Sequence, residues 1–249
     1  MARKNQKIKR EFSARFVKGG NIKVGKMWIW NTLKGGDVIH IDYRGKSFQC
    51  AGTCGKLCKD CGCDKACYVN ASYNIYPSVK YGHARNTIAM RQSYANTFEE
   101  LYNQLKRARN KPTFVRIHAS GEFEDVREIE MFNALALAFP QVVFYTYSKN
   151  FPVWDAWLNE NKLADNFILN VSIWHGFGIP FFMRWSHLPN VRAYVYDDGY
   201  NYTADGLKID CHCPAYKKDG KLIHEKTCDK CGLCMLYGNR CKVVGCYAH

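Results

Sequence analysis

The 249-residue sequence lacks the segments that direct a chain into a membrane or out of the cell. Its first residues, MARKNQKIKREF, include basic side chains but no apolar stretch like the centre of a secretory signal peptide. No apolar run approaches the roughly 20 residues that a transmembrane helix needs. Internal repeats and low-complexity segments are also missing. We therefore expect a cytoplasmic, globular protein without membrane contact.

Acidic residues are scarce. Lys and Arg number 36 against 22 Asp and Glu, a net charge of +14, and Glu11 is the only acid among the first 26 residues. Such a field attracts nucleic acid or a small anionic or zwitterionic substrate, although a solvated basic arm explains it equally well. With 47% hydrophobic and 14% aromatic residues, the chain can bury a substantial core.

Cysteine is absent from the middle of the chain, and all 13 cysteines lie in two clusters near its ends. Six fall between Cys50 and Cys67 and seven between Cys211 and Cys246. In a reducing cytosol, thiols do not form lasting disulfides, and an odd number cannot all pair. Closely spaced thiolates on a short loop can instead converge on one metal ion or cluster. The distribution therefore favours bound metal.

The first cluster has the spacing of an iron–sulfur site. Cys54, Cys58 and Cys61 follow C-x3-C-x2-C, in which three thiolates hold three irons of a [4Fe-4S] cluster. The fourth iron would then be open to a substrate or cofactor.

The second cluster resembles the cysteine run of bacterial ferredoxins. Cys228, Cys231 and Cys234 follow C-x2-C-x2-C, and Cys213, which precedes Pro214, offers a further thiolate. Zinc is the alternative for either cluster, because one C-x2-C pair from each can supply its four ligands.

The pattern between the clusters predicts alternating strands and helices. Helical spacing with a proline or polar stop occurs at residues 97–110, 124–139 and 153–162, the first with a Thr97–Glu100 capping box. Buried strands are expected at 113–119, 141–148, 167–173 and 191–197. Two more strands, 27–32 and 37–43, flank Lys34-Gly35-Gly36 and predict a β-hairpin.

This alternation implies right-handed crossovers and therefore an α/β fold with a mostly parallel sheet, either open or curled into a partial (β/α) barrel. Three segments are expected, packed as one body. Residues 1–49 form a basic arm and hairpin, residues 50–210 an α/β core that begins with the first cysteine loop, and residues 211–249 a cysteine-rich metal module.

Polar residues follow successive strands, where the active sites of parallel sheets lie. We take His118, Glu122 and Lys149 as candidate catalytic residues, because they can exchange protons or bind a carboxylate near neutral pH. Each of these positions also suits a turn or loop cap. Candidate substrate-binding residues on the same rim are Ser120, Tyr145, Ser148, Ser172 and His175.

The ordered motifs TCGKLCKDCGCDKACY, VRIHASGEF, FYTYSKN, NVSIWHG, CPAY and TCDKCGLC resemble the gene product 88 family of mycobacteriophage and other tailed-phage proteins. The resemblance covers most of the chain and implies a viral protein in the host cytoplasm, without a particular chemistry. It marks the recurring cysteines as the stronger ligand candidates: Cys54, Cys58, Cys67, Cys213, Cys228, Cys231 and Cys234. The remaining six are additional here: Cys50, Cys61, Cys63, Cys211, Cys241 and Cys246.

A weaker resemblance is to radical S-adenosylmethionine enzymes, whose partial barrels carry C-x3-C-x2-C after the first strand and Gly-Gly-Glu after the second. Here Ser120-Gly121-Glu122 ends the next candidate strand. Asp60 occupies a position where that family prefers an aromatic residue, and no glycine-rich adenine-binding motif follows. Cys67 in place of Cys61 is therefore an alternative third ligand.

These observations predict an iron–sulfur enzyme of lyase or oxidoreductase type. Its substrate would be a small sulfur-containing or amino-carboxylate molecule, such as S-adenosylmethionine or a low-molecular-weight thiol, at a cluster with an open iron. The expected ligands are Cys54, Cys58, Cys61, Cys67, Cys213, Cys228, Cys231 and Cys234. The alternative is a zinc-binding protein that binds nucleic acid through its basic N-terminal arm and catalyses nothing.

Overall fold

The computed structural model describes residues 12–19, 27–63, 67–174, 177–197, 206–215, 223, 226–235 and 241–247. Its centre is an eight-stranded sheet. The strands are β1 (Val17–Lys18), β2 (Trp28–Trp30), β5 (Phe114–Ile117), β6 (Val143–Ser148), β7 (Phe167–Ile173), β8 (Val191–Asp197), β9 (Cys211–His212) and β10 (Val243–Tyr247). They lie in the order β1-β2-β5-β6-β7-β8-β10-β9, and only β1 is antiparallel to its neighbour.

The mostly parallel α/β sheet is thus confirmed. The strand order keeps β1 and β9 as separate edges in the described part of the chain, so closure toward a barrel is not confirmed. Strands from all three predicted segments pair within this one sheet.

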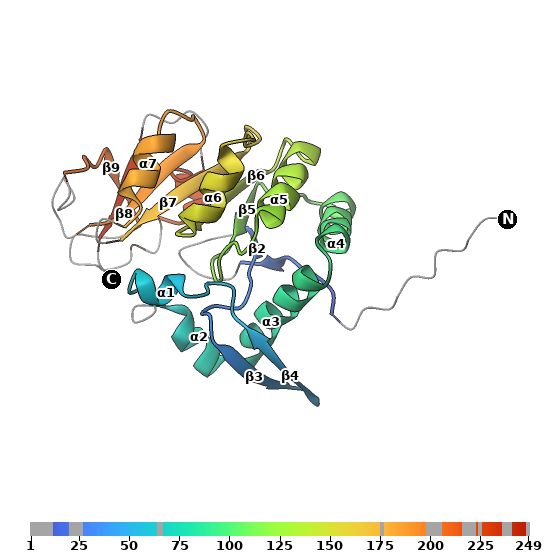
Figure 1. Ribbon diagram of the computed structural model, residues 1–249. Coiled ribbons are helices and arrows are strands. Elements are labelled where there is room, and N and C mark those ends of the chain that lie inside the picture. Colours follow the sequence, from blue (N-terminus) through green and yellow to red (C-terminus); the bar gives the residue numbers. More distant parts are fainter. Residues whose placement is uncertain are drawn as a thin grey trace.

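Four helices cover one face of the sheet: α4 (Tyr94–Arg107), α5 (Val126–Ala138), α6 (Phe151–Leu158) and α7 (Ile179–Trp185) (Figure 1). Because the strands from β5 to β8 follow chain order, each right-handed crossover returns its helix to the same side. Strand residues that face these helices are apolar, for example Val115, Phe144 and Leu169, and they form the main core. We call this side the helical face.

The predicted strands 113–119, 141–148, 167–173 and 191–197 correspond to β5 to β8, and the predicted helices to α4, α5 and α6. The predicted start of α4 is wrong. Its N-cap is Ser93, whose side chain accepts a hydrogen bond from the Asn96 N–H (3.2 Å). Thr97 is buried inside the helix. Glu100 instead accepts from the Ala14 N–H (2.6 Å), a tertiary contact that the local pattern does not reveal.

The predicted hairpin is also wrong. Strand β2 pairs in parallel with β5, whereas β3 (Val38–Tyr43) pairs with β4 (Lys46–Ala51). The turn lies at Arg44 and Gly45, which both have positive φ (49° and 74°), as a tight hairpin turn requires. Gly36 serves close packing, because a Cβ there would lie 2.2 Å from the Gly55 carbonyl oxygen.

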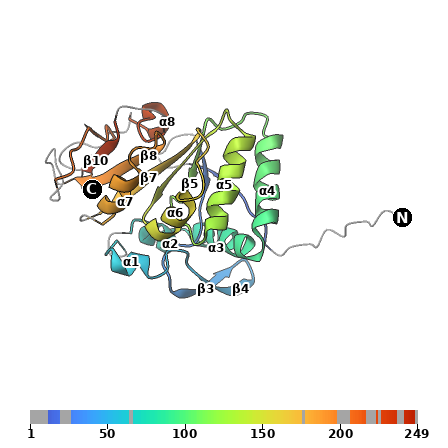
Figure 2. The ribbon, with the colours of Figure 1, turned by 45° about the horizontal axis from the view of Figure 1, so that its top comes forward.

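The hairpin, α1 (Leu57–Asp60), α2 (Val69–Ile75) and α3 (Pro77–Gln92) lie together beside the sheet (Figure 1). The last helix, α8 (Cys228–Cys231), lies with β10 toward the end of the sheet away from α4 (Figure 2). Among the described residues, no helix has the length and apolar character needed to span a membrane.

Candidate metal centre and strand-end site

Four predicted ligands, Cys213, Cys228, Cys231 and Cys234, line a single pocket. Helix α8 carries the middle two, and Gly232 ends that helix in the left-handed conformation (φ 70°), which turns the chain toward Cys234. Cys213 comes from a separate segment directly after β9. Two stretches of chain therefore supply one set of thiols.

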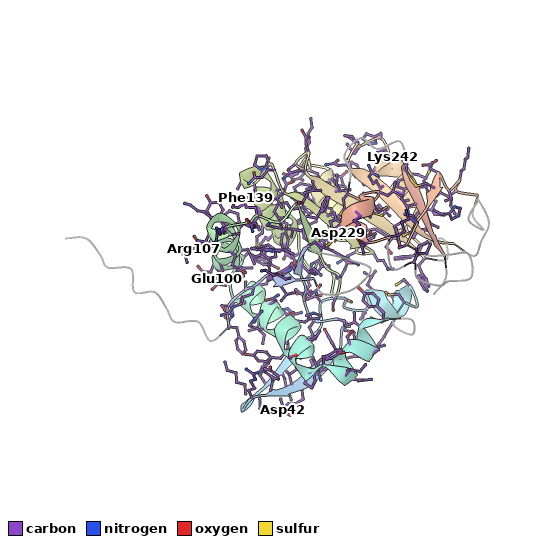
Figure 3. All side chains as sticks on the ribbon, turned by 180° about the vertical axis from the view of Figure 1, so that it is seen from behind. Asp42, Glu100, Arg107, Phe139, Asp229 and Lys242 are labelled. Carbon is purple, nitrogen blue, oxygen red and sulfur yellow. A yellow bond between two sulfur atoms is a disulfide. The ribbon has the colours of Figure 1, made fainter. Side chains whose placement is uncertain are left out.

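The pocket lies against the sheet face opposite α4 to α7. Tyr145 and Tyr147 of β6 and Tyr194 of β8 form its wall, and we call this side the tyrosine face. The Tyr147 ring lies 4.9 Å from Tyr194 and 6.0 Å from Tyr145. Figure 3 views the protein from this side, with Asp229 of α8 labelled. Tyr145 was predicted on the strand-end rim, and the structure places it here instead.

The four thiols act on one another electrostatically. The pKa of Cys234 is raised to about 12, mainly by burial; a hydrogen bond with Tyr147 opposes this rise, and Cys213, Cys228 and Cys231 add to it. Burial likewise raises the pKa of Cys231. Within the described ranges, however, no three His, Cys, Asp or Glu side chains are placed closely enough to hold a metal ion. Metal binding at the cysteine loops stays a prediction.

Sequence reasoning missed two arginines on the tyrosine face. Arg116 of β5 lies over the Tyr147 ring, 5.1 Å from its centroid. Arg192 of β8 is fully buried and donates from Nη1 to the carbonyl oxygens of Leu233 (2.7 Å) and Cys241 (3.2 Å). The available signal was an arginine inside each of two strands that otherwise read as buried.

Cys211 and Cys241 form a disulfide, which contradicts the expectation that every thiol stays reduced. Their Cα atoms are 6.1 Å apart, within the usual disulfide range. They come together because β9 and β10 are neighbours at the edge of the sheet. Neither was a predicted metal ligand.

The first cysteine loop is anchored to the sheet just before Cys54. The Cys54 N–H donates to the Gly35 carbonyl (2.8 Å), and the Thr53 hydroxyl accepts from the Glu122 N–H (2.8 Å). The same hydroxyl hydrogen-bonds with the Thr32 hydroxyl (2.9 Å). These contacts place the loop at the carboxyl ends of β2 and β5.

The predicted ligands of this loop divide into two groups. Cys54 and Cys67 both raise the pKa of Tyr73, which burial raises most, so both lie near that phenol. A side-chain hydrogen bond with Cys63 and burial raise the pKa of Cys61, and Lys149 is close enough to oppose this. The side chain of Cys58 is outside the described residues.

The rim residues of β5 and β6 meet around the Glu122 carboxylate. Its Oε1 accepts from the Ser148 hydroxyl (2.7 Å) and the Phe123 N–H (2.9 Å), and its Oε2 accepts from the Lys149 N–H (2.7 Å). Glu122 is only 6% exposed. Its carboxylate thus ties the end of β5 to the end of β6.

His118 forms a buried ion pair below this rim. Its Nε2 lies 2.9 Å from Oε1 of Glu128, and neither side chain is exposed. Burial opposes the charged form, but Glu128 and then Glu122 raise the pKa of His118 above its ordinary value. Its Nδ1 hydrogen-bonds with the Thr32 hydroxyl (3.1 Å), which links the pair to the first cysteine loop.

The structure therefore groups most of the predicted rim beside the first loop: His118, Ser120, Glu122, Ser148 and Lys149. Ser172 lies farther along the sheet, paired with Tyr194. His175 is outside the described residues. The catalytic and substrate-binding roles of these residues stay predictions.

Fold and sites define an α/β protein with a mostly parallel sheet, a cysteine loop at its strand ends and a second cysteine segment on its tyrosine face. The chain belongs to the gene product 88 family, whose model matches residues 5–236. Comparison with curated proteins and with solved structures found no match. The resemblance to radical S-adenosylmethionine enzymes therefore has no support from the comparisons.

Proposed function

We propose that the protein is an iron–sulfur protein whose C-terminal centre is held by Cys213, Cys228, Cys231 and Cys234. The observation that carries the proposal is the convergence of these four thiols on one pocket of the tyrosine face. Thiolates are soft ligands, which suit iron–sulfur clusters and zinc. Three cysteines at C-x2-C-x2-C spacing, with Cys213-Pro214, favour the cluster.

The residues around the pocket fit such a centre. Ligand thiols release their protons when metal binds, and a site need not be formed before the metal is present. Metal binding would draw α8 and the segment after β9 together so that the four sulfurs meet. Tyr147 already forms a hydrogen bond with Cys234 and can orient that ligand.

The first loop supports a second, open centre that acts on a small substrate. Cys54 and Cys67 both lie near Tyr73, and Lys149 lies near Cys61. A bound cluster would supply an open iron for a sulfur or amino-carboxylate ligand. Lys149 would bind the substrate carboxylate, while the Glu122 bridge holds the backbone of Lys149 in place. S-adenosylmethionine and low-molecular-weight thiols are the proposed substrate class.

Anaerobic expression with iron, zinc and acid-labile sulfide analysis tests the proposal. The protein should be brown and contain iron and sulfide. Cys231→Ser should lose the iron and sulfide bound by the C-terminal cysteines. Cys50→Ser, which changes a buried cysteine of β4, should keep them. Colourless protein with stoichiometric zinc, even after reconstitution with iron and sulfide, would overturn the iron–sulfur assignment. Protein that binds neither metal would overturn the metal centre itself.

The zinc outcome would favour the non-catalytic alternative, nucleic-acid binding through the basic N-terminal arm. Residues 1–11 of that arm lie outside the described residues. Binding of this kind should weaken steeply with salt, because each phosphate contact releases counterions.

A further inference from the structure

Two cationic side chains flank the C-terminal pocket on the tyrosine face. Arg116 is in β5 and Arg192 is in β8. Strands β6 and β7 lie between them, and β6 carries Tyr145 and Tyr147. A buried charge is costly unless an opposite charge or a full set of hydrogen bonds compensates it. The two guanidinium groups therefore need compensating neighbours.

Among the described residues, the main electrostatic neighbours of Arg116 include no carboxylate. Its Nε is buried and has no hydrogen-bond partner in the described part of the chain, where no ion pair includes this arginine either. Its electrostatic neighbours are Tyr68, Tyr145, Tyr147 and Cys228. Phenols are neutral near pH 7. Cys228 is the one neighbour in this set that metal binding makes anionic.

Arg192 occupies the corresponding position beside Cys234. Burial lowers the pKa of Arg192, and Cys234 is the neighbour that opposes this most strongly. Its hydrogen bonds to the Leu233 and Cys241 carbonyls fix the guanidinium next to the end of the C-x2-C-x2-C run. One arginine thus lies near the first cysteine of that run and the other near its last.

The charges match those of a centre with four thiolates. Four thiolates around a zinc ion or a [4Fe-4S]²⁺ cluster leave two negative charges, whereas three thiolates around the same centre leave one. We propose that Arg116 and Arg192 are the counter-charges of a closed, four-thiolate centre in the C-terminal pocket. This inference rests on the proposed function and deepens it, because a closed centre takes no substrate and leaves open-iron chemistry to the first loop.

Arg116→Met gives the most direct test, because the change removes the charge and keeps much of the volume. Anaerobic, reduced protein in a Cys54→Ser, Cys67→Ser background is titrated with Zn²⁺ alone against a chromophoric chelator. We expect Zn²⁺ affinity to fall by about tenfold or more, as for other residues that support metal ligands. The metal-free variant should melt at a higher temperature than the metal-free parent, because a buried charge without a counter-charge has gone.

If Arg116 is a counter-charge, Arg116→Met should lower the Zn²⁺ affinity and raise the melting temperature of the metal-free protein. Loss of a structural arginine would not give these two opposite changes. Arg116→Lys keeps a positive charge and should lose less affinity than Arg116→Met. Arg107→Met, which changes an exposed arginine of α4 (Figure 3), is the matched control and should change neither quantity. A lower melting temperature of metal-free Arg116→Met with unchanged affinity would overturn the inference. Arg192→Met is a weaker probe, because it also removes two hydrogen bonds.

The closed centre has its own test in Cys213→Ser. If all four thiolates are ligands, this variant should lose Zn²⁺ binding as fully as Cys231→Ser. Retained binding in Cys213→Ser would indicate three ligands and overturn the closed centre. A parent protein that binds no metal at these cysteines would overturn the proposed function. A parent that binds normally, with Arg116→Met indistinguishable from it, would overturn only the role of the arginine.

Discussion

The two cysteine regions are held to the same sheet by different means. Hydrogen bonds from Thr53 and the Cys54 N–H fix the start of the first loop to β2 and β5, and a buried polar network of Thr32, His118 and Glu128 continues beneath it. Four C-terminal cysteines line one pocket together with tyrosines of the sheet. The first loop is held by hydrogen bonds, whereas α8 and the segment after β9 share a pocket in which a bound metal would join their cysteines.

Because of this difference, a bound metal should contribute unequally to the folding of the two regions. Hydrogen bonds between protein groups persist when a metal leaves, so the start of the first loop should keep its position. The C-terminal segment has the thiols of Cys213 and α8 as potential cross-links between two stretches of chain. The order of α8 and of the chain around Cys213 should therefore depend more on a bound metal than that of the first loop.

The largest expected effect is the loss of C-terminal order when metal is removed. Cys231→Ser, or anaerobic chelation of the parent, should expose residues 226–235 to rapid hydrogen exchange, whereas β10 should stay protected by its pairing with β8. Residues 27–54 should stay protected. Structural zinc sites in small domains contribute on the order of 10 kcal/mol, so the metal-loaded parent should melt at a clearly higher temperature. Exchange measured by mass spectrometry checks this, with Cys50→Ser as control, and equal loosening of both regions would contradict the comparison.

The repeating strand–helix part of the fold could be predicted from the sequence. Residues 97–197 alternate between strands with buried apolar runs and helices with amphipathic spacing, so β5 to β8 and α4 to α6 could be predicted together with their parallel order. The hairpin could not be predicted correctly, because Gly35 and Gly36 suggested a turn, whereas Gly36 permits close approach to Gly55. The pairing of β2 with β5 joins residues far apart in sequence.

For the sites, spacing identified the four cysteines that share a pocket, and strand ends identified the rim of Glu122, Ser148 and Lys149. The placement of Arg116 and Arg192 on the tyrosine face could not be predicted, because the strand pattern alone does not tell which face of the sheet the metal-binding segment covers. Tyr145 was misplaced for the same reason. The Glu128 partner of His118 lies on a helix, and only the tertiary packing brings the two together.

Glu128→Gln tests the buried support of the first loop and should have the next largest effect. Removing one partner of a buried ion pair costs about 3–5 kcal/mol. The pKa of His118 is raised in the folded protein, so its charged form stabilises the fold fully below the ordinary histidine pKa of about 6.5. This contribution is lost as pH rises through the raised pKa. Urea unfolding should thus show a difference between parent and Glu128→Gln that shrinks at alkaline pH.

The matched control for this change is Glu130→Gln, an exposed glutamate on the same helix. Its effect should be small and nearly independent of pH. Metal content should be unchanged in both variants. A difference for Glu128→Gln that grows with pH would show that His118 is neutral in the folded protein, and the loop would then rest on neutral hydrogen bonds alone.

The smallest expected effect separates support from chemistry at the rim. In Glu122→Gln, one carboxylate oxygen becomes an NH₂ group that must face a donor, either the Lys149 N–H or the Ser148 hydroxyl with the Phe123 N–H. A buried mismatch of this kind costs about 1–3 kcal/mol, and exposed Glu160→Gln is the matched control. Metal content should stay at the parent level, because Glu122 is no ligand in the proposed centres.

If Glu122 also exchanges protons with a substrate, any activity found with S-adenosylmethionine or a small thiol should fall by about a hundredfold or more, beyond what the lost stability explains. Unfolding at the parent's urea midpoint would show that the bridge between β5 and β6 is not needed. Loss of metal in Glu122→Gln would instead show that the rim and the first cysteine loop depend on one another more closely than the two cysteine regions do.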